Sequence, residues 1–291
     1  MPRTDNAGPM QRSAFLATAG AAAIAPGLAP DAALSRIEAR TGGRLGVFAR
    51  DAGSGLTLAH RAGERFPMCS TFKVLAVAAV LARVDRGRER LSRRIAYGES
   101  DLLHYSPVAR ANLRAGAMSL GALCAAALEW SDNAAANLLL AALGGPKAVT
   151  RYARSLGDGL TRLDRTEPAL NAATPGDPRD TTTPAAMAAD WQRLLLGDAL
   201  RPTTRRFLAV HLDAAKTGLQ RIRAGIPHDW RAGDKTGSGD NGTSNDVALL
   251  SPPRRAPIVV AAYLTGAAVS GDARDAALAE VGRVVVRAFA R

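Results

Sequence analysis

The spacing of hydrophobic and polar residues changes along this chain. Near both ends the two kinds alternate, and this period of two predicts short strands over residues 44–50, 55–61, 230–237, 246–251 and 257–265. Elsewhere the spacing is helical. It predicts helices over residues 32–40 and 273–290 and through most of 71–212, with loops at 98–108, 144–147 and about 161–183.

The order of these elements predicts the fold. Strands at both ends of the chain and helices in the middle are typical of an α/β (α+β) protein, in which one antiparallel sheet is completed by both termini. We expect a five-stranded sheet flanked by helices, formed by residues 31–68 and 214–291. An all-helical domain, residues 69–213, is inserted into it and includes the 161–183 loop. A cleft between the two parts is the expected place for an active site.

The first 30 residues, approximately, are predicted to be an export signal. Arg3 and Arg12 precede an apolar segment, Ala14–Ala25, which is followed by Pro26 and small residues. The alternative is a buried N-terminal helix. We expect the mature chain to begin between residues 26 and 34 and to act in the periplasm or outside the cell. The segment after Arg12 resembles a twin-arginine signal but lacks the second arginine, so both export routes stay open.

Composition narrows the function classes. The chain has 291 residues, 47% of them hydrophobic and 22% charged, which is ordinary for a globular protein. The net charge is +12, yet the basic residues are scattered and aromatic residues make up only 4%, so nucleic-acid binding is not expected. Four histidines and two cysteines show no metal-ligand spacing, which argues against a bound metal.

Ser70 and Lys73 form the first candidate for catalysis. They begin a long apolar helix, where positions three apart share a face, so we expect the hydroxyl and the amine within reach of each other. A serine at a helix start also lies beside unpaired backbone N–H groups. This arrangement suits a serine nucleophile with a nearby base, although a capping serine followed by a lysine is also common without any function.

Two further motifs carry hydroxyl, amide and amine groups. Ser131-Asp132-Asn133 precedes a predicted helix, where it can equally be a simple N-cap. Lys-Thr-Gly occurs twice, at residues 216–218 and 235–237. We interpret the first copy as a turn between helical segments. The second lies on an alternating strand and continues into Ser238, so Lys235 is the candidate for binding substrate.

The three motifs together resemble those of penicillin-binding proteins and class A serine β-lactamases. About 60 residues separate the first motif from the second, and about 100 more lead to Lys235. The string from Ser131 to Asn137 is also similar to the family pattern, and the resemblance covers nearly the whole mature chain. It implies a β-lactamase that hydrolyses penicillins and cephalosporins and confers resistance to them. The alternatives within this superfamily are a D-Ala-D-Ala peptidase and a penicillin-binding protein that does not hydrolyse its ligand.

The segment Arg165-Thr-Glu167-Pro168-Ala-Leu-Asn171 favours the hydrolase. It resembles the R-x-E-P-x-L-N loop of class A β-lactamases, in which a carboxylate and an amide hold one water between them. Glu167 would then be the general base that directs the water at the ester. The resemblance also implies a clasp between Arg165 and Asp180 and a cis peptide before Pro168.

The resemblance implies a role for each further site residue. Ser70 attacks the lactam, and the backbone N–H groups of Ser70 and Ser238 form the oxyanion hole. Either Lys73, or Glu167 through a water, accepts the proton of the serine. Ser131 relays a proton to the lactam nitrogen. The residues expected to bind or line the substrate are Tyr105, Asn133, Asn171, Lys235, Thr236, Gly237, Ser238 and Arg221.

Arg221 and the cysteines mark where this chain departs from other members. Many relatives use an arginine on the strand after Lys-Thr-Gly, where this chain has Ser244; Arg221 matches the alternative arginine of another subset. The partners that the resemblance would supply for Cys69 and Cys124 are absent, so both thiols are expected to be free and buried. The missing bridge at Cys69 argues against strong carbapenem hydrolysis, whereas Ser238 is compatible with cephalosporins. A monomer without cofactor or membrane insertion is expected.

Overall fold

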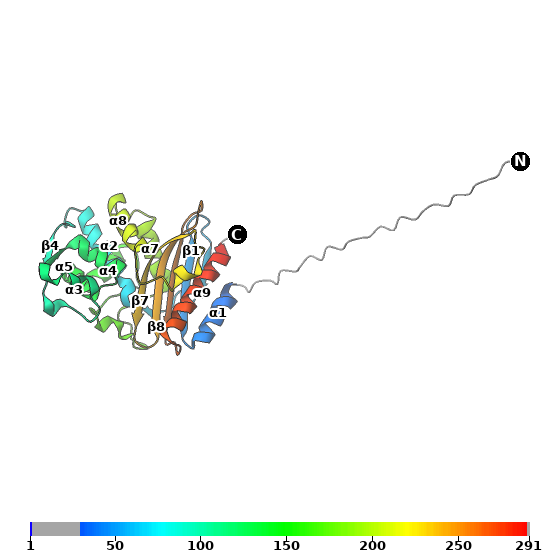
Figure 1. The fold of residues 1–291 in the computed structure, drawn as a ribbon. Helices are drawn as coiled ribbons and strands as arrows, with labels where there is room; N and C mark the ends of the chain where they lie inside the picture. The colour runs from blue at the N-terminus through cyan, green and yellow to red at the C-terminus, as the bar shows by residue number, and fades with distance from the viewer. Residues whose placement is uncertain (2–29, 290–291) are drawn as a thin grey trace.

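A five-stranded antiparallel sheet forms the centre of the molecule (Figure 1). The structure is a computed structural model that describes Met1 and residues 30–289. The strands run in the order β2-β1-β9-β8-β7 and comprise β1 (Arg44–Asp51), β2 (Thr57–His60), β7 (Arg231–Gly239), β8 (Thr243–Ser251) and β9 (Ile258–Thr265). The predicted sheet, with strands from both ends of the chain, is confirmed.

β9 lies in the middle of the sheet and is buried on both faces. Val259, Ala261 and Tyr263 belong to a hydrophobic cluster with the central helices. The alternate residues, among them Val260 and Leu264, belong to a second cluster on the other face. Because side chains of a strand alternate between faces, this single strand contributes to both layers of packing.

Two helices cover the outer face of the sheet side by side, α1 (Pro30–Thr41) and α9 (Gly271–Phe289) (Figure 1). Leu34 and Ile37 of α1 and Leu278 and Val281 of α9 are fully buried against it. The predicted helices 32–40 and 273–290 therefore form, and residue 290 lies outside the described residues. The predicted export signal also lies outside them.

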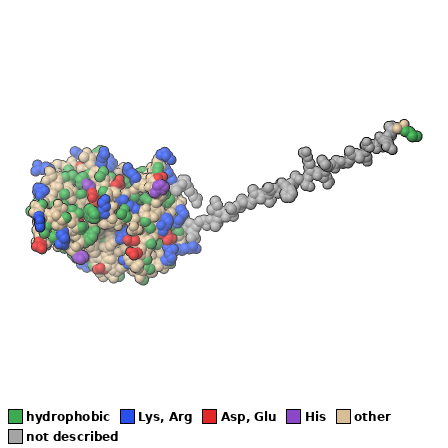
Figure 2. All heavy atoms as spheres, in the orientation of Figure 1, with side chains coloured by type: hydrophobic (Ala, Val, Ile, Leu, Met, Phe, Trp, Pro, Cys, Tyr) green, Lys and Arg blue, Asp and Glu red, His purple; other side chains and the backbone are tan. Residues whose placement is uncertain are grey.

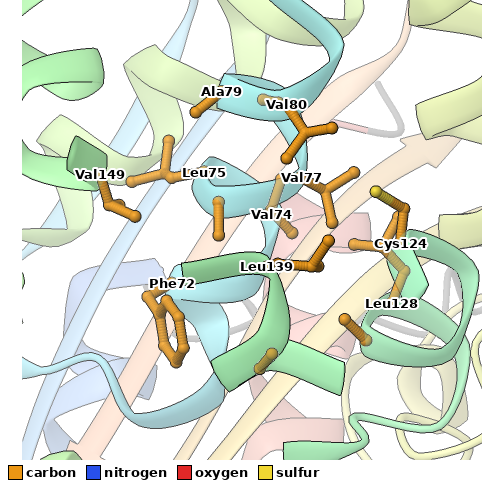
Figure 3. Close-up of a cluster of buried hydrophobic side chains, with 14 of the residues drawn as sticks. Phe72, Val74, Leu75, Val77, Ala79, Val80, Cys124, Leu128, Leu139 and Val149 are labelled. Carbon is orange, nitrogen blue, oxygen red and sulfur yellow. The ribbon is translucent and has the colours of Figure 1, made fainter. Parts of the chain in front are cut away.

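The other face is covered by the helical part of the chain. It contains α2 (Phe72–Asp85), α3 (Pro107–Ala111), α4 (Leu120–Glu129), α5 (Asn133–Leu143), α6 (Lys147–Ser155), α7 (Pro184–Leu195) and α8 (Pro202–Asp213). Every residue of α2 from Phe72 to Ala82 is buried, and Figure 3 shows its side chains packed against Leu139 of α5 and Val149 of α6. A helix that is apolar on all sides must be surrounded, so α2 becomes the centre of this part.

The sequence analysis did not predict several short elements. They are the strand pairs β3 (Phe66–Pro67) with β6 (Thr181–Thr182) and β4 (Arg94–Ala96) with β5 (Ala117–Ser119), and the 3₁₀ turns η1 (Cys69–Thr71), η2 (Glu99–Asp101), η3 (Leu113–Ala115), η4 (Ala169–Ala172) and η5 (Ile222–Gly225). Segments of two to four residues are too short to show a period.

The proposed division of the chain at residues 69 and 213 remains a prediction. α7, which falls within the inserted part, packs directly against β1 and β9. No helix within residues 30–289 is long and apolar enough to span a bilayer. Figure 2 shows Lys and Arg side chains scattered over the visible face, interspersed with acidic and apolar ones.

Candidate active site

Ser70 lies at the junction of the sheet and the helical part. It is the central residue of η1, which leads into α2 at Phe72, so the helix begins two residues later than Ser70 itself. The preceding residue, Cys69, has a φ of 45°, in the left-handed region that non-glycine residues rarely adopt. Such local strain is common at functional sites and here fixes the turn that presents the Ser70 hydroxyl.

Strands β7 and β8 hold this turn in place. Asn245 of β8 donates from Nδ2 to the carbonyl oxygens of Pro67 and Met68, at 2.9 and 3.2 Å. A Cβ on Gly237 would lie 2.6 Å from the Met68 carbonyl oxygen. Only glycine therefore allows β7 to pass so close to the chain before Ser70.

One carboxylate oxygen connects the serine and the lysine. The Ser70 hydroxyl donates to Glu167 Oε1 at 3.3 Å, and Lys73 Nζ lies 3.0 Å from the same atom. Among the residues that the structure describes, no hydrogen bond joins Ser70 directly to Lys73. The expected contact between hydroxyl and amine is thus mediated by Glu167, a residue 97 positions further along the chain.

The Lys73 side chain is enclosed by the protein, and oxygen atoms surround its amine. Its Nζ donates to the Asn133 side-chain oxygen at 2.6 Å and to the Ser131 carbonyl at 2.7 Å. Burial lowers the pKa of Lys73, while the negative charge of Glu167 opposes the shift. A lysine in this environment loses its proton more readily than one in water, so it can take part in proton transfer.

Ser131 lies between the two buried lysines. Lys235 Nζ donates to Ser131 Oγ at 3.0 Å, and Lys73 Nζ lies 3.4 Å from the same oxygen. Burial, and then the positive charge of Lys73, lower the pKa of Lys235 to about 7. Asp132 caps α5 by accepting from the Ala135 N–H, as predicted for an N-cap, and so fixes the start of this helix.

The 161–183 loop brings Glu167 to this centre. Arg165 Nε donates to Asp180 at 2.5 Å, and Asp180 also accepts from the backbone N–H groups of Asp164 and Arg165. The peptide bond before Pro168 is cis. The clasp and the cis bond that the resemblance implied are therefore both present.

Asn171 and Asn137 hold Glu167 from two sides. Asn171 Nδ2 donates to Glu167 Oε2 at 2.5 Å. Asn137 of α5 makes two bonds of 2.9 Å with the Glu167 backbone, donating to its carbonyl and accepting from its N–H. The sequence analysis names Asn137 only as part of a motif and predicts no role for it. Its position one helical turn after Asn133 was the available signal, because residues four apart share a face.

The edge of β7 forms the opposite wall. Arg221 Nη2 donates to Ser238 Oγ at 2.8 Å, and Nη1 donates to the carbonyl oxygens of Gly237 and Asn245. Asp275 of α9 accepts from Arg221 Nε at 2.8 Å. Ser244 is buried and accepts from Arg274 at 3.1 Å. The guanidinium predicted to serve this strand therefore does reach it.

Thr217 is a site residue that the sequence analysis missed. The first Lys-Thr-Gly was interpreted as a turn, and it does lie outside the helices and strands. Its Thr217 hydroxyl nevertheless lies 2.7 Å from the Thr236 hydroxyl of the second copy. Nothing in the local sequence signals this contact, because it depends on how the segment after α8 packs on β7.

The cleft has a volume of about 320 Å³, which suits a small molecule. Its lining consists of Ser70, Tyr105, Ser131, Asn133, Asn171, Thr217, Arg221, Thr236 and Ser238. Tyr105 is 44% exposed at the rim. Lys73, Glu167 and Lys235 lie beneath this lining and are almost inaccessible. The predicted site residues thus converge, on a centre that can transfer an acyl group and move protons.

The cysteines and the potential metal ligands are the remaining candidates for reactive groups. Cys69 and Cys124 are both free and buried, and burial raises the pKa of each thiol. In the part of the chain that the structure describes, no group of His, Cys, Asp or Glu side chains could hold a metal ion. The Ser70 hydroxyl lies beside Glu167, which pairs with Lys73.

Comparisons with known proteins agree with this geometry. Residues 29–289 match the model of the β-lactamase enzyme family. The chain is 48% identical to β-lactamase CTX-M-97 of Escherichia coli, over 88% of each chain. It is 50% identical to β-lactamase AST-1 of Nocardia asteroides, over 89% of this chain and 83% of the relative.

Solved structures show the same fold. An ancestral class A β-lactamase reconstructed for Gram-negative bacteria is 60% identical, with a TM-score of 0.88 over 90% of this chain and all of the other. A putative class A β-lactamase, PenP, from Rhodopseudomonas palustris is 53% identical, with a TM-score of 0.88 over 89% of this chain and 99% of the other.

Proposed function

Because this chain belongs to the β-lactamase enzyme family, we propose that it hydrolyses the amide bond of β-lactams through an acyl-enzyme on Ser70. The observation that carries this proposal is the position of Glu167, whose Oε1 accepts from Ser70 while Oε2 accepts from Asn171. A β-lactamase of this kind confers resistance to penicillins and cephalosporins.

Acylation begins when Ser70 Oγ attacks the lactam carbonyl. Its proton passes to the Lys73–Glu167 pair, whose atoms lie next to the hydroxyl. The backbone N–H groups of Ser70 and Ser238 stabilise the oxyanion, and a donor of this kind contributes about 3 kcal/mol to the transition state. Ser131, bonded to both lysines, delivers a proton to the lactam nitrogen as the C–N bond breaks.

Deacylation needs a water molecule directed at the ester. Glu167 is a suitable general base because it is already within hydrogen-bond distance of Ser70 and is fixed through its backbone by Asn137. The Asn171 side-chain oxygen has no donor among the described residues and is available to orient that water. The water attacks the ester carbonyl, its proton goes to Glu167, and Ser70 leaves with a proton returned from the same pair.

The opposite wall binds the substrate. Lys235 and Thr236 form charge-assisted and hydroxyl contacts with the substrate carboxylate. Arg221 adds a second positive charge behind Ser238 and Gly237. Asn133 contacts the acylamino side chain, and Tyr105 covers the entrance.

We also infer that the chain is exported and acts as a monomer in the periplasm or outside the cell. Arg3, Arg12 and the apolar segment Ala14–Ala25 support export. α1 begins at Pro30, within the range expected for the mature start. Expression of the full chain, followed by N-terminal sequencing of the exported protein, tests this inference.

The purified enzyme is expected to turn over nitrocefin and benzylpenicillin many times per active site. Its cleft holds both the acylating serine and the water-activating glutamate, so the ester does not persist. Product is measured by absorbance against enzyme concentration. A single stoichiometric burst without turnover would instead identify a penicillin-binding protein, and release of D-alanine from a D-Ala-D-Ala peptide would identify a peptidase.

The KM for benzylpenicillin is expected to rise about tenfold between pH 6 and pH 8. The pKa of Lys235 is about 7, so its ammonium group loses its proton over this range and its attraction for the carboxylate weakens. The arginine of Lys235→Arg keeps its charge from pH 6 to pH 8, so the KM of this variant should not change over that range. Equal pH profiles for the two enzymes would remove Lys235 from carboxylate binding.

A further inference from the structure

Two carboxyl groups face each other in the interior beside the start of the 161–183 loop. Asp158 follows α6 and is 7% exposed, and Asp190 lies in the middle of α7 and is completely buried. Gly157, next to Asp158, lies against Arg193 of α7, and each of the two carboxyl groups shifts the pKa of the other. Neither residue lines the active-site cleft, and the mechanism above uses neither.

Asp158 is bonded to the chain that enters the loop. Its Oδ1 accepts from the backbone N–H groups of Leu160 and Thr161, at 2.7 and 3.0 Å. Its Oδ2 and both carboxyl oxygens of Asp190 have no donor among the side chains and backbone that the structure describes. A buried carboxylate oxygen without a donor is costly, so a proton held between the two groups stabilises this arrangement.

That proton belongs to Asp190. Two carboxylates in one dry site cannot both be ionised. Burial alone would raise the pKa of Asp158, but its hydrogen bonds from Thr161 and Leu160 outweigh this and lower it. Asp190 has no such donors: burial, and then the charge of Asp158, raise its pKa to about 9. Asp190 is therefore the donor and Asp158 the acceptor.

Other polar groups around the pair do not replace this proton. Arg193 of α7 and Arg154 of α6 both favour the ionised form of Asp190, but burial and Asp158 outweigh them. Burial, with a smaller contribution from the charge of Asp190, raises the pKa of the phenols of Tyr152 on α6 and Tyr263 on β9. Both phenols therefore stay neutral while Asp190 titrates.

The turn at Asp158 controls where the loop begins. The Thr161 hydroxyl lies 2.6 Å from the Thr182 hydroxyl, and Arg162 N–H donates to the Thr181 carbonyl at 3.0 Å, so the two ends of the loop are joined directly after this turn. Arg154 donates to the carbonyl oxygens of Asp158 and Thr161. A displacement of Asp158 would shift both ends of the segment that carries Glu167.

We propose that Asp190 is a positioning residue for deacylation: its carboxyl O–H donates to Asp158 Oδ2 and so fixes the base of the 161–183 loop. The proposal rests on the proposed function, in which Glu167 directs the hydrolytic water. Asp190 touches neither substrate nor water. It acts through Asp158, the amides of Leu160 and Thr161, and the loop between its two joined ends.

Asp190→Asn tests the protonation state. An asparagine Nδ2 donates to Asp158 at every pH, whereas the aspartic acid of the parent loses stability as pH rises through the range between its unfolded pKa and about 9. We expect parental kcat at pH 7. We also expect the Tm of Asp190→Asn, relative to the parent, to increase by roughly 10 °C between pH 5 and pH 9.

Asp190→Ala tests the positioning role. Without a donor, Asp158 shifts and Glu167 no longer holds its water accurately, so deacylation slows while acylation is preserved. We expect kcat and KM to fall together by roughly tenfold, with kcat/KM unchanged, and the acyl-enzyme to accumulate in a mass spectrum. Leu34→Ala, a cavity variant in the other hydrophobic cluster, is the control. It should lower Tm without changing kcat or the pH dependence of Tm.

The outcomes separate this proposal from the proposed function. If the parent enzyme shows no turnover, the function fails, and the Tm series of Asp190→Asn still decides whether Asp190 carries the proton. If the parent turns over normally, a flat Tm difference between pH 5 and pH 9, or parental kcat in Asp190→Ala, overturns the proposal. Should Asp190→Ala fail to fold, Asp190→Asn remains decisive, because a tenfold loss of kcat at pH 7 in that variant contradicts it.

Discussion

Replacing Glu167 by glutamine is expected to convert the enzyme into one that is acylated once and then stalls. The general base for the water is lost, and general-base catalysis of this kind contributes a factor of roughly 10³. Acylation should survive. Glu167 is the main influence that opposes the lowering of the Lys73 pKa, so in its absence the buried lysine is neutral more of the time and can accept the Ser70 proton.

Rapid mixing with nitrocefin should therefore give a burst of one product per Glu167→Gln enzyme, followed by turnover roughly 10³-fold slower than in the parent. Mass spectrometry should show the covalent adduct on the peptide that contains Ser70. The exposed residue Glu99 supplies the matched control, because Glu99→Gln makes the same chemical change away from the cleft and should behave as the parent does. Parental turnover in Glu167→Gln would remove Glu167 from water activation.

Lys73→Ala is expected to fail at acylation, the step that precedes deacylation. Lys73 Nζ and Glu167 Oε1 form an ion pair that is almost fully buried on both sides. Removing the cation takes away one of the two groups beside the Ser70 hydroxyl and leaves the buried Glu167 carboxylate without its ion partner, so it is no longer held in place as a base. Both routes for the Ser70 proton are then lost, and we expect acylation to slow by roughly 10³-fold.

Lys73→Ala and Glu167→Gln should therefore be blocked at different steps. Lys73→Ala should show no burst and no covalent adduct under conditions in which Glu167→Gln accumulates it. Lys147→Ala, which removes an exposed lysine at the start of α6, is the control and should retain parental activity. A normal burst in Lys73→Ala would assign the serine proton to another acceptor and would contradict the pairing described above.

Sequence reasoning was most accurate where the signal is local. The predicted strand at residues 257–265 depends on a run of neighbouring residues, and it forms as β9. Its two faces fill the two hydrophobic clusters. It was least accurate for the strands β3 and β6, which consist of two residues each. Those strands exist because the segment before Ser70 meets the end of the 161–183 loop, a long-range contact that leaves no local period.

The same limit applied to the site. Thr217 was interpreted as part of a turn, because only the packing of its segment on β7 brings it to Thr236. Lys73 was expected within reach of Ser70 because of their spacing in a helix. The chain instead begins α2 after a 3₁₀ turn, and Glu167 takes the place between them.

By itself, the sequence determined which groups are present for catalysis and the kind of element that carries each, because motif chemistry and hydrophobic period are properties of neighbouring residues. Only the tertiary structure decided which groups meet. Ser131 and Lys235 are 104 residues apart, and their contact depends on the packing of the helical part against the sheet. Burial, and with it the pKa of Lys73, Lys235 and Asp190, follows from that packing, because no residue is removed from water by its neighbours in the chain alone.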